Sequence, residues 1–124
     1  MTTLPRWARP ALWATAIVNF LAAAGFLPPA HALRAAAGLP DDGHPLYLMA
    51  LSLFVLLFGV AYLRWAQTGR ADRLFLALAA VGKLSFFSLL LGFWIAGTLP
   101  LRAPLAGAWD LVFGIMFLRW LRGA

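Results

Sequence analysis

The chain of 124 residues contains neither cysteine nor glutamate. The absence of cysteine excludes disulfides, thiolate zinc sites, iron–sulfur clusters and cysteine nucleophiles. The absence of glutamate leaves four aspartates as the acidic side chains, and only Asp110 falls within a long apolar stretch. Side chains for general acid–base catalysis are therefore scarce. No catalytic residue is predicted, and an enzyme is the least favoured class of function.

Histidine is also scarce, and neither His31 nor His44 lies in a long apolar stretch. This excludes bis-histidine haem ligation within such a stretch. Asp41 and Asp42 lie between the two histidines and are residue types that suit zinc, but the spacing is loose and contains no i, i+4 pair. Asp41, Asp42 and Gly43 are instead typical of a solvated turn. No metal site and no cofactor is predicted.

Charged residues make up 11% of the chain and hydrophobic residues 64%, whereas soluble domains carry about a quarter charged residues. The mean hydropathy is +0.87. Four apolar stretches reach the ~18–20 residues needed to cross a bilayer: 11–28, 46–66, 74–98 and 103–121. Backbone amides in lipid must be satisfied internally, and these stretches lack the alternation of barrel strands. The sequence predicts an all-α protein, a four-helix bundle integral to the membrane, in one domain over residues 1–124.

The connections between these stretches carry helix-stop signals. Pro28-Pro29 ends the first predicted helix, because proline removes a hydrogen-bond donor and clashes with the preceding turn. Within the longest connection, "AHALRAAAG" predicts a short surface helix that stops at Gly38. Pro104 suits the first turn of the last helix.

Arginine is distributed unevenly about the predicted spans. Two arginines, Arg34 and Arg102, lie on one side and seven on the other. Those seven are Arg6, Arg9, Arg64, Arg70, Arg73, Arg119 and Arg122. Cytoplasmic loops are enriched in basic residues, so both termini are predicted to be cytoplasmic. Because the arginines lie at the ends of apolar stretches, the net charge of +6 indicates lipid headgroups as the partner, and no nucleic-acid partner is predicted.

An alternative for the first stretch is a cleaved secretory signal. Arg6 and Arg9 precede an apolar run, and 30–32 has the A-x-A pattern of a cleavage site. The run is long for a signal core and contains Trp13 and Asn19, which favours an uncleaved first helix. Cleavage would leave the predicted orientation of the later helices unchanged.

Three polar residues fall at one predicted depth. Lys83, the only lysine, is ten residues past Arg73, and Asn19 is ten past Arg9, so both lie about 15 Å from the inner boundary. Asp110 precedes Arg119 by nine residues, a depth of about 13–14 Å.

A single ionisable side chain facing lipid at that depth costs ~2.5–3.5 kcal/mol on an insertion scale. We therefore expect an ion pair between Lys83 and Asp110 within the bundle, with Asn19 hydrogen-bonded to one of them. Lysine, unlike arginine, can lose its proton when buried. Two interpretations stay open: the pair is structural, or it belongs to a site for a ligand, a proton or another subunit.

Small and polar residues mark the helix faces expected to look inward, since close approach drives packing in lipid. Ser85, beside Lys83, joins the candidate polar core on this basis. Tyr62 is also a candidate, although its position near the inner boundary is more typical of an interfacial anchor. The four expected inward strips are Ala16/Asn19/Ala23, Ser52/Gly59/Tyr62, Gly82/Ser85/Gly92/Ala96 and Gly107/Asp110/Gly114.

Several short motifs resemble a pattern in small bacterial four-helix membrane proteins without assigned function. They are Asn19-Phe20, Gly59, Tyr62, "GKL" at 82–84 and Asp110-Leu111. The resemblance implies a multi-pass protein of the bacterial cytoplasmic (inner) membrane, with no activity or cofactor attached. Similarity to the small DoxX-like proteins is confined to helix number and length.

Two functions remain in contention. The first is a binding or accessory membrane protein that holds an apolar or anionic ligand, or a partner subunit, near Lys83, Asp110 and Asn19. The second is a small oligomeric transporter in which Lys83 and Asp110 form a proton-linked site. Either would act in the lipid bilayer, as a homo-oligomer or within a larger membrane complex.

Overall fold

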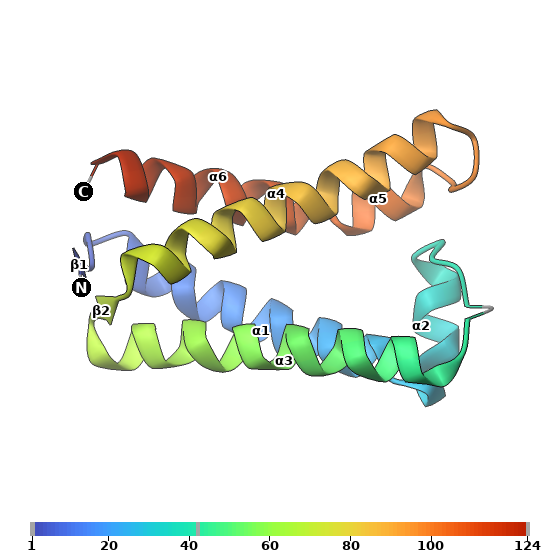
Figure 1. The fold of residues 1–124 in the computed structure, drawn as a ribbon, viewed down its shortest axis with the longest axis horizontal. Coiled ribbons are helices and arrows are strands. Elements are labelled where there is room, and N and C mark those ends of the chain that lie inside the picture. Colours follow the sequence, from blue (N-terminus) through green and yellow to red (C-terminus); the bar gives the residue numbers. More distant parts are fainter. Residues whose placement is uncertain (1, 42, 124) are drawn as a thin grey trace.

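The computed structural model describes residues 2–41 and 43–123, and this part of the chain is mostly helical (Figure 1). The α-helices are α1 (Ala8–Phe26), α2 (His31–Ala36), α3 (Pro45–Thr68), α4 (Arg73–Ile95), α5 (Arg102–Ala106) and α6 (Ala108–Gly123). A 3-10 turn, η1 (Pro28–Ala30), joins α1 to α2. Two short strands, β1 (Thr2–Thr3) and β2 (Arg70–Ala71), pair antiparallel with Thr2 opposite Ala71.

Two helices, α3 and α4, are each long and apolar enough to cross a membrane, with mean hydropathies of 2.3 and 2.1. The first predicted stretch meets this criterion only together with η1 and α2, from which α1 is bent by 91°. The last predicted stretch is not one helix: α5 and α6 are separated at Gly107, and α6 has 16 residues. The side chain of Leu90 occupies the place where a Cβ of Gly107 would lie, so α4 packs directly against the interruption.

Local residue chemistry sets the helix ends. Leu27 is extended before Pro28 and ends α1, while Gly38 follows α2 with φ +75°, as the predicted short helix requires. The His44 side chain accepts a hydrogen bond from Leu46 N at 3.0 Å at the start of α3. Asp72 caps α4 by accepting a bond from Phe75 N at 2.9 Å.

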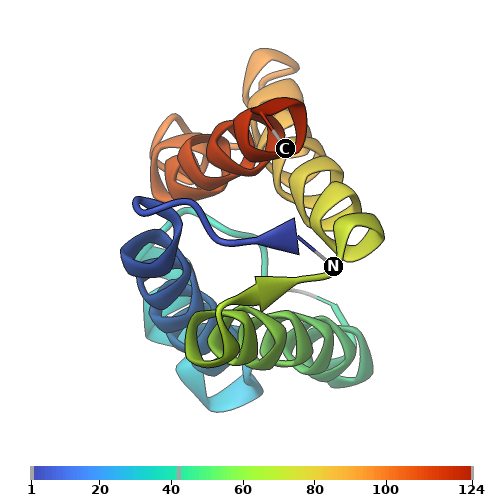
Figure 2. The same cartoon turned by 90° about the vertical axis from the view of Figure 1, so that its left-hand side faces the viewer.

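The four longer helices form two hairpins, α1 with α3 and α4 with α6, and contacts between the hairpins are fewer than within them. Figure 2 views them from the end where both termini lie. In the first hairpin, Ser52 Oγ donates to Ala23 O at 2.6 Å. In the second, Leu84 of α4 packs against Gly114 of α6.

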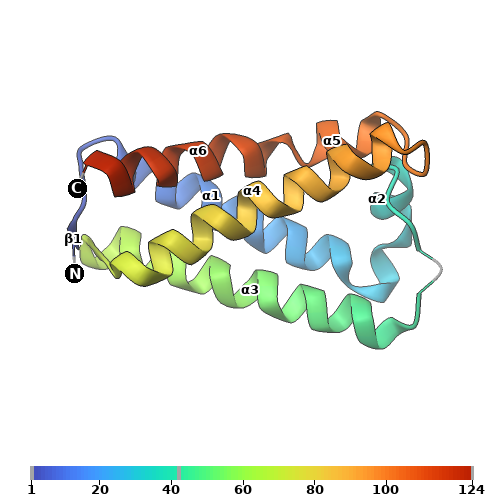
Figure 3. The same cartoon turned by 45° about the horizontal axis from the view of Figure 1, so that its top comes forward.

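The hydrophobic core is concentrated toward the end of the bundle that holds the termini. Leu12, Tyr62, Leu76 and Phe117 are almost fully buried there, and the rings of Tyr62 and Phe117 lie 5.4 Å apart. Toward the opposite end the hairpins diverge, and α2 lies across that end (Figures 1 and 3).

Three of the four predicted inward strips lie on buried or half-buried faces, but the one on α4 does not. Gly82, Ser85 and Gly92 are exposed, and α4 instead buries Leu76, Ala79, Ala80, Lys83 and Leu90. The reason is the way that α4 packs against α6 and the residue before it in the second hairpin. Leu90 of α4 fits over Gly107, which precedes α6, and Leu84 fits over Gly114 of α6, so these glycines and not those of α4 allow the close approach.

Gly114→Ala tests this packing. The added Cβ would lie 2.7 Å from Leu84 Cγ and 3.3 Å from Leu84 N, so we expect a loss of about 1–3 kcal/mol. The measurement is the thermal unfolding midpoint in detergent, which should fall. Gly92→Ala is the matched control, because no heavy atom lies within 4 Å of its Cβ position. Equal midpoints for the two variants would contradict the packing described here.

Candidate functional site

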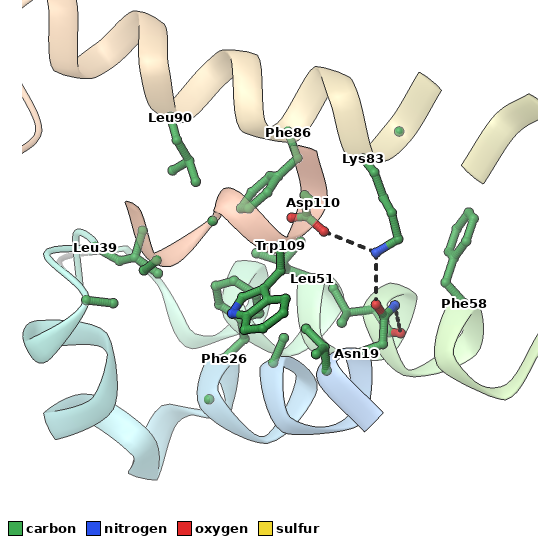
Figure 4. A pocket seen from close by; sticks show the side chains of 18 of the residues that line it. Asn19, Phe26, Leu39, Leu51, Phe58, Lys83, Phe86, Leu90, Trp109 and Asp110 are labelled. Atoms are coloured by element: carbon green, nitrogen blue, oxygen red, sulfur yellow. Dashed lines mark hydrogen bonds and ion pairs between the residues drawn. The ribbon is translucent and has the colours of Figure 1, made fainter. Parts of the chain in front are cut away.

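Lys83, Asp110 and Asn19 meet between the hairpins (Figure 4). Lys83 Nζ lies 3.1 Å from Asp110 Oδ1 and donates to Asn19 Oδ1 at 3.1 Å. The Lys83 side chain is 8% exposed and that of Asp110 is 23% exposed. The predicted buried ion pair is confirmed, as is the contact of Asn19 with it.

Asn19 also makes a polar contact with α3, the one long helix that contributes no side chain to the cluster. Asn19 Nδ2 donates to Val55 O at 3.0 Å. Gly59 follows Val55 by one helical turn, and a Cβ at that position would lie only 3.1 Å from Asn19 Cβ. The glycine therefore lets Asn19 approach the α3 backbone. A single run of hydrogen bonds connects α6, α4, α1 and α3 in that order.

Aromatic rings cover the Lys83 ammonium on the side of the packed core. The ring centroids of Tyr62 and Phe113 lie 5.3 Å and 5.6 Å from Nζ, within the range of cation–π attraction. Tyr62 is 1% exposed. The interpretation of Tyr62 as an interfacial anchor is therefore wrong, because its ring is enclosed by protein between Lys83 and Phe117.

On its other side the polar cluster borders a cavity of about 390 Å³. Residues of all six α-helices line it, and Asn19, Lys83 and Asp110 supply its polar end. The walls are apolar and aromatic, with Phe26, Phe86 and Trp109 among the side chains drawn in Figure 4. The cavity lies in the part of the molecule where the hairpins diverge, away from the packed core.

Ser85 does not join this site. It lies on an exposed face of α4 and is not among the residues that line the cavity. It follows Lys83 by two residues, a spacing that places side chains on different faces of a helix. Of the five candidate site residues, the structure gathers Lys83, Asp110, Asn19 and Tyr62 and leaves Ser85 outside.

Arg34 also lines the cavity, a position that the sequence analysis did not predict, since it treated this arginine only as a charge that sets orientation. It is 3% exposed. Its guanidinium donates to the backbone oxygens of Gly25, Leu27 and Pro28 at 3.0, 2.5 and 3.1 Å. The last carbonyls of a helix lack donors of their own, so Arg34 satisfies the end of α1 and fixes α2 across the cavity. An arginine one turn after Pro28-Pro29 was the signal available in the sequence.

Asp41 holds Arg34 in place. Arg34 Nε donates to Asp41 Oδ1 at 2.6 Å, and His31 Nδ1 contacts Asp41 Oδ2. The hydrogen bond with His31, followed by that from Arg34, lowers the pKa of the Asp41 carboxyl. A lowered pKa means that the carboxylate stabilises the fold above its ordinary pKa and loses this effect as the pH falls through the lowered value. The cluster is therefore intact at neutral pH.

The prediction of a merely solvated turn is thus wrong for Asp41, and Asp42 lies outside the described residues. Within residues 2–41 and 43–123, no group of three or more histidine or aspartate side chains gathers at a metal-binding spacing.

Comparisons with protein-family models, with curated proteins and with solved structures find no match. The resemblance to small bacterial four-helix membrane proteins therefore stays a prediction.

We predict that Lys83 and Asp110 contribute to the stability of the fold as a coupled pair. Lys83→Met or Asp110→Leu alone leaves one buried charge without its partner, which typically costs about 3–5 kcal/mol. The double variant removes both charges and should lose much less than the sum of the single losses. Unfolding midpoints in detergent for the four proteins measure this coupling. Additive losses would show that the two side chains act independently.

Proposed function

We propose that the chain is a four-span protein of the bacterial inner membrane that binds one amphipathic ligand between its hairpins. The ligand's apolar part fills the cavity, and its polar head meets Lys83, Asp110 and Asn19. The observation that carries the proposal is the cavity itself, which is apolar along its walls and ends on a buried cluster of hydrogen-bonding groups.

The outer surface supports residence in a bilayer. Large apolar side chains are exposed along both α3 and α4, far beyond the small patches normal for soluble proteins. On α3 they include Leu46, Met49, Leu53, Leu57 and Val60, and on α4 Leu74, Leu78, Val81, Leu89 and Phe93.

Helix length supports four spans. The 19 residues of α1 cover about 28 Å, close to the ~30 Å of hydrocarbon. Arg102 through Gly123 comprise the 5 residues of α5, Gly107 and the 16 residues of α6, and cover about 33 Å. A one-residue interruption buried against Leu90 is compatible with a span, because protein and not lipid surrounds it.

The position of the arginines supports cytoplasmic termini. The start of α1, the end of α3, the start of α4 and the end of α6 all lie at one end of the bundle (Figure 1). The seven arginines on the predicted cytoplasmic side lie in or next to these helix ends, whereas Arg34 and Arg102 lie at the other end.

Single-cysteine labelling tests this topology, because the natural chain has no cysteine. In intact bacteria, a membrane-impermeant maleimide should label Gly43→Cys and Thr98→Cys. Gln67→Cys and Gly123→Cys should react only after the cells are permeabilised. Labelling of Gly123→Cys in intact cells would remove the last span from the proposal.

The cavity favours binding over a purely structural ion pair. A pair that served only to fix helix neighbours would be best sealed, yet Lys83 and Asp110 both line an open volume. About 390 Å³ lies within the ~300–1,000 Å³ usual for small-molecule sites. A mostly apolar lining with a few convergent polar groups is also typical of such sites.

A transporter would require a cavity that reaches the ion pair, and this cavity does. The packing on the far side of the ion pair, however, favours a protein that retains its ligand over one that passes it through. Tyr62, Phe113 and Phe117 lie between the cluster and the end of the bundle with the termini, and all are buried. A ligand at Lys83 therefore meets a closed aromatic layer.

Ala22→Phe tests the proposal by filling the cavity, which Ala22 lines. Protein in nanodiscs is exposed to three decyl probes that carry a photoreactive diazirine and end in an alcohol, a carboxylate or an amine. At least one probe should label buried cavity residues such as Leu90, and Ala22→Phe should reduce that labelling about tenfold. Leu21→Phe, on the neighbouring exposed position, is the matched control and should change nothing. Absence of cavity labelling by every probe would overturn the proposed function.

A further inference from the structure

We infer that the ligand's head is a neutral hydroxyl, and that the site selects a long-chain alcohol over the fatty acid or amine of equal length. The inference rests on the proposed function and names the class of ligand that the polar end of the cavity recognises. Three features of the cavity carry it: the balance of its charges, the hydrogen-bonding groups that remain open, and the chemistry of its walls.

The charges lining the cavity are already balanced. At one end the Lys83 ammonium is matched by the Asp110 carboxylate. At the other end Arg34, which also lines the cavity, is matched by Asp41. An ionised head would add an unmatched charge to an apolar volume, where charge is poorly solvated. A neutral head adds none.

The open hydrogen-bonding groups at the cluster include a donor on Lys83 and an acceptor on Asp110, besides the second N–H of Asn19. An ammonium has three N–H groups, and Lys83 uses two of them, toward Asp110 Oδ1 and Asn19 Oδ1. Asp110 Oδ2 accepts no hydrogen bond from the residues that the structure describes. Both Lys83 and Asp110 line the cavity, and Asp110 is the more exposed of the two.

A hydroxyl matches this pair of groups, because it donates one hydrogen bond and accepts others. It can accept from the third Lys83 N–H and donate to Asp110 Oδ2. A carboxylate head only accepts, and would face the Asp110 carboxylate. An ammonium head only donates, and would face the Lys83 ammonium. Each ionised head therefore pairs with only one of these two groups and faces a like charge on the other.

The walls fit an unsubstituted chain. From Lys83 the lining passes Phe86, Leu51 and Phe26 to Leu39 near α2, side chains that offer no hydrogen bond (Figure 4). Polar groups along the ligand's tail would be left without partners there. The head meets the polar side chains near Lys83. The tail meets mostly apolar side chains, and beyond Lys83 and Asn19 only Arg34 and Trp109 among the lining residues carry side-chain N–H groups.

The test uses the wild-type protein in nanodiscs with four photoreactive decyl probes: the alcohol, the methyl ether, the carboxylate and the amine. Labelling of Leu90, a buried residue of the cavity lining, is divided by labelling of Leu57, an exposed α3 residue outside it, so that differences in membrane partition cancel. The alcohol should exceed each of the others by about tenfold or more. The ether accepts but cannot donate a hydrogen bond. The amount by which its labelling ratio falls below that of the alcohol therefore measures the hydrogen bond to Asp110.

Two variants ask whether the cluster sets this preference. Asp110→Asn leaves the ammonium unmatched, and the carboxylate probe should then label best. Lys83→Met/Asp110→Leu removes both charges, and the alcohol should lose its advantage over the ether. The double variant keeps the test valid even where Asp110→Asn does not fold.

The outcomes separate the two proposals. Cavity labelling that is strongest with the carboxylate or the amine in the wild type overturns the hydroxyl inference while ligand binding stands. An order of probes that is the same in the wild type and the double variant also overturns it. Failure of all four probes to label the cavity overturns the proposed function itself.

Discussion

The ion pair between Lys83 and Asp110 is the interaction on which the rest of the structure depends. Neither charge is tolerable alone in an apolar interior, so α4 and α6 must meet in one register. Lys83 then also donates to Asn19, and Asn19 to the backbone of α3, which brings all four long helices together at one level. Gly59 and Gly114 are the backbone positions that make these close approaches sterically feasible.

This polar level divides the molecule into unlike halves. Toward the termini, aromatic and leucine side chains fill the space between the hairpins. Toward α2, the hairpins diverge around a cavity with apolar walls. The same side chains thus complete a packed core on one side and border the cavity on the other. Arg34 gives the far end a comparable arrangement, since its guanidinium both closes α1 and borders the cavity.

The ion pair and Asn19 could be predicted from the sequence because charge in an apolar run must be matched, and helical rise converts residue number into depth. The inward face of α4 could not, since it depends on Leu84 and Leu90 meeting glycines of another helix. For the same reason Ser85 was misplaced and the interruption at Gly107 was missed. The position of Arg34 could not be predicted, because three of its hydrogen bonds go to backbone carbonyls, which side-chain patterns do not reveal.

The hairpins are contiguous in the chain, and the two charges belong to the same one. During synthesis, α1 and α3 emerge first and bring only the uncharged amide of Asn19. Lys83 follows, and its counter-ion arrives 27 residues later within the same hairpin. The second hairpin can therefore neutralise itself before it docks. At assembly the first hairpin therefore meets an ion pair. Its Lys83 ammonium still has an N–H to donate to Asn19, and its charge is already balanced by Asp110.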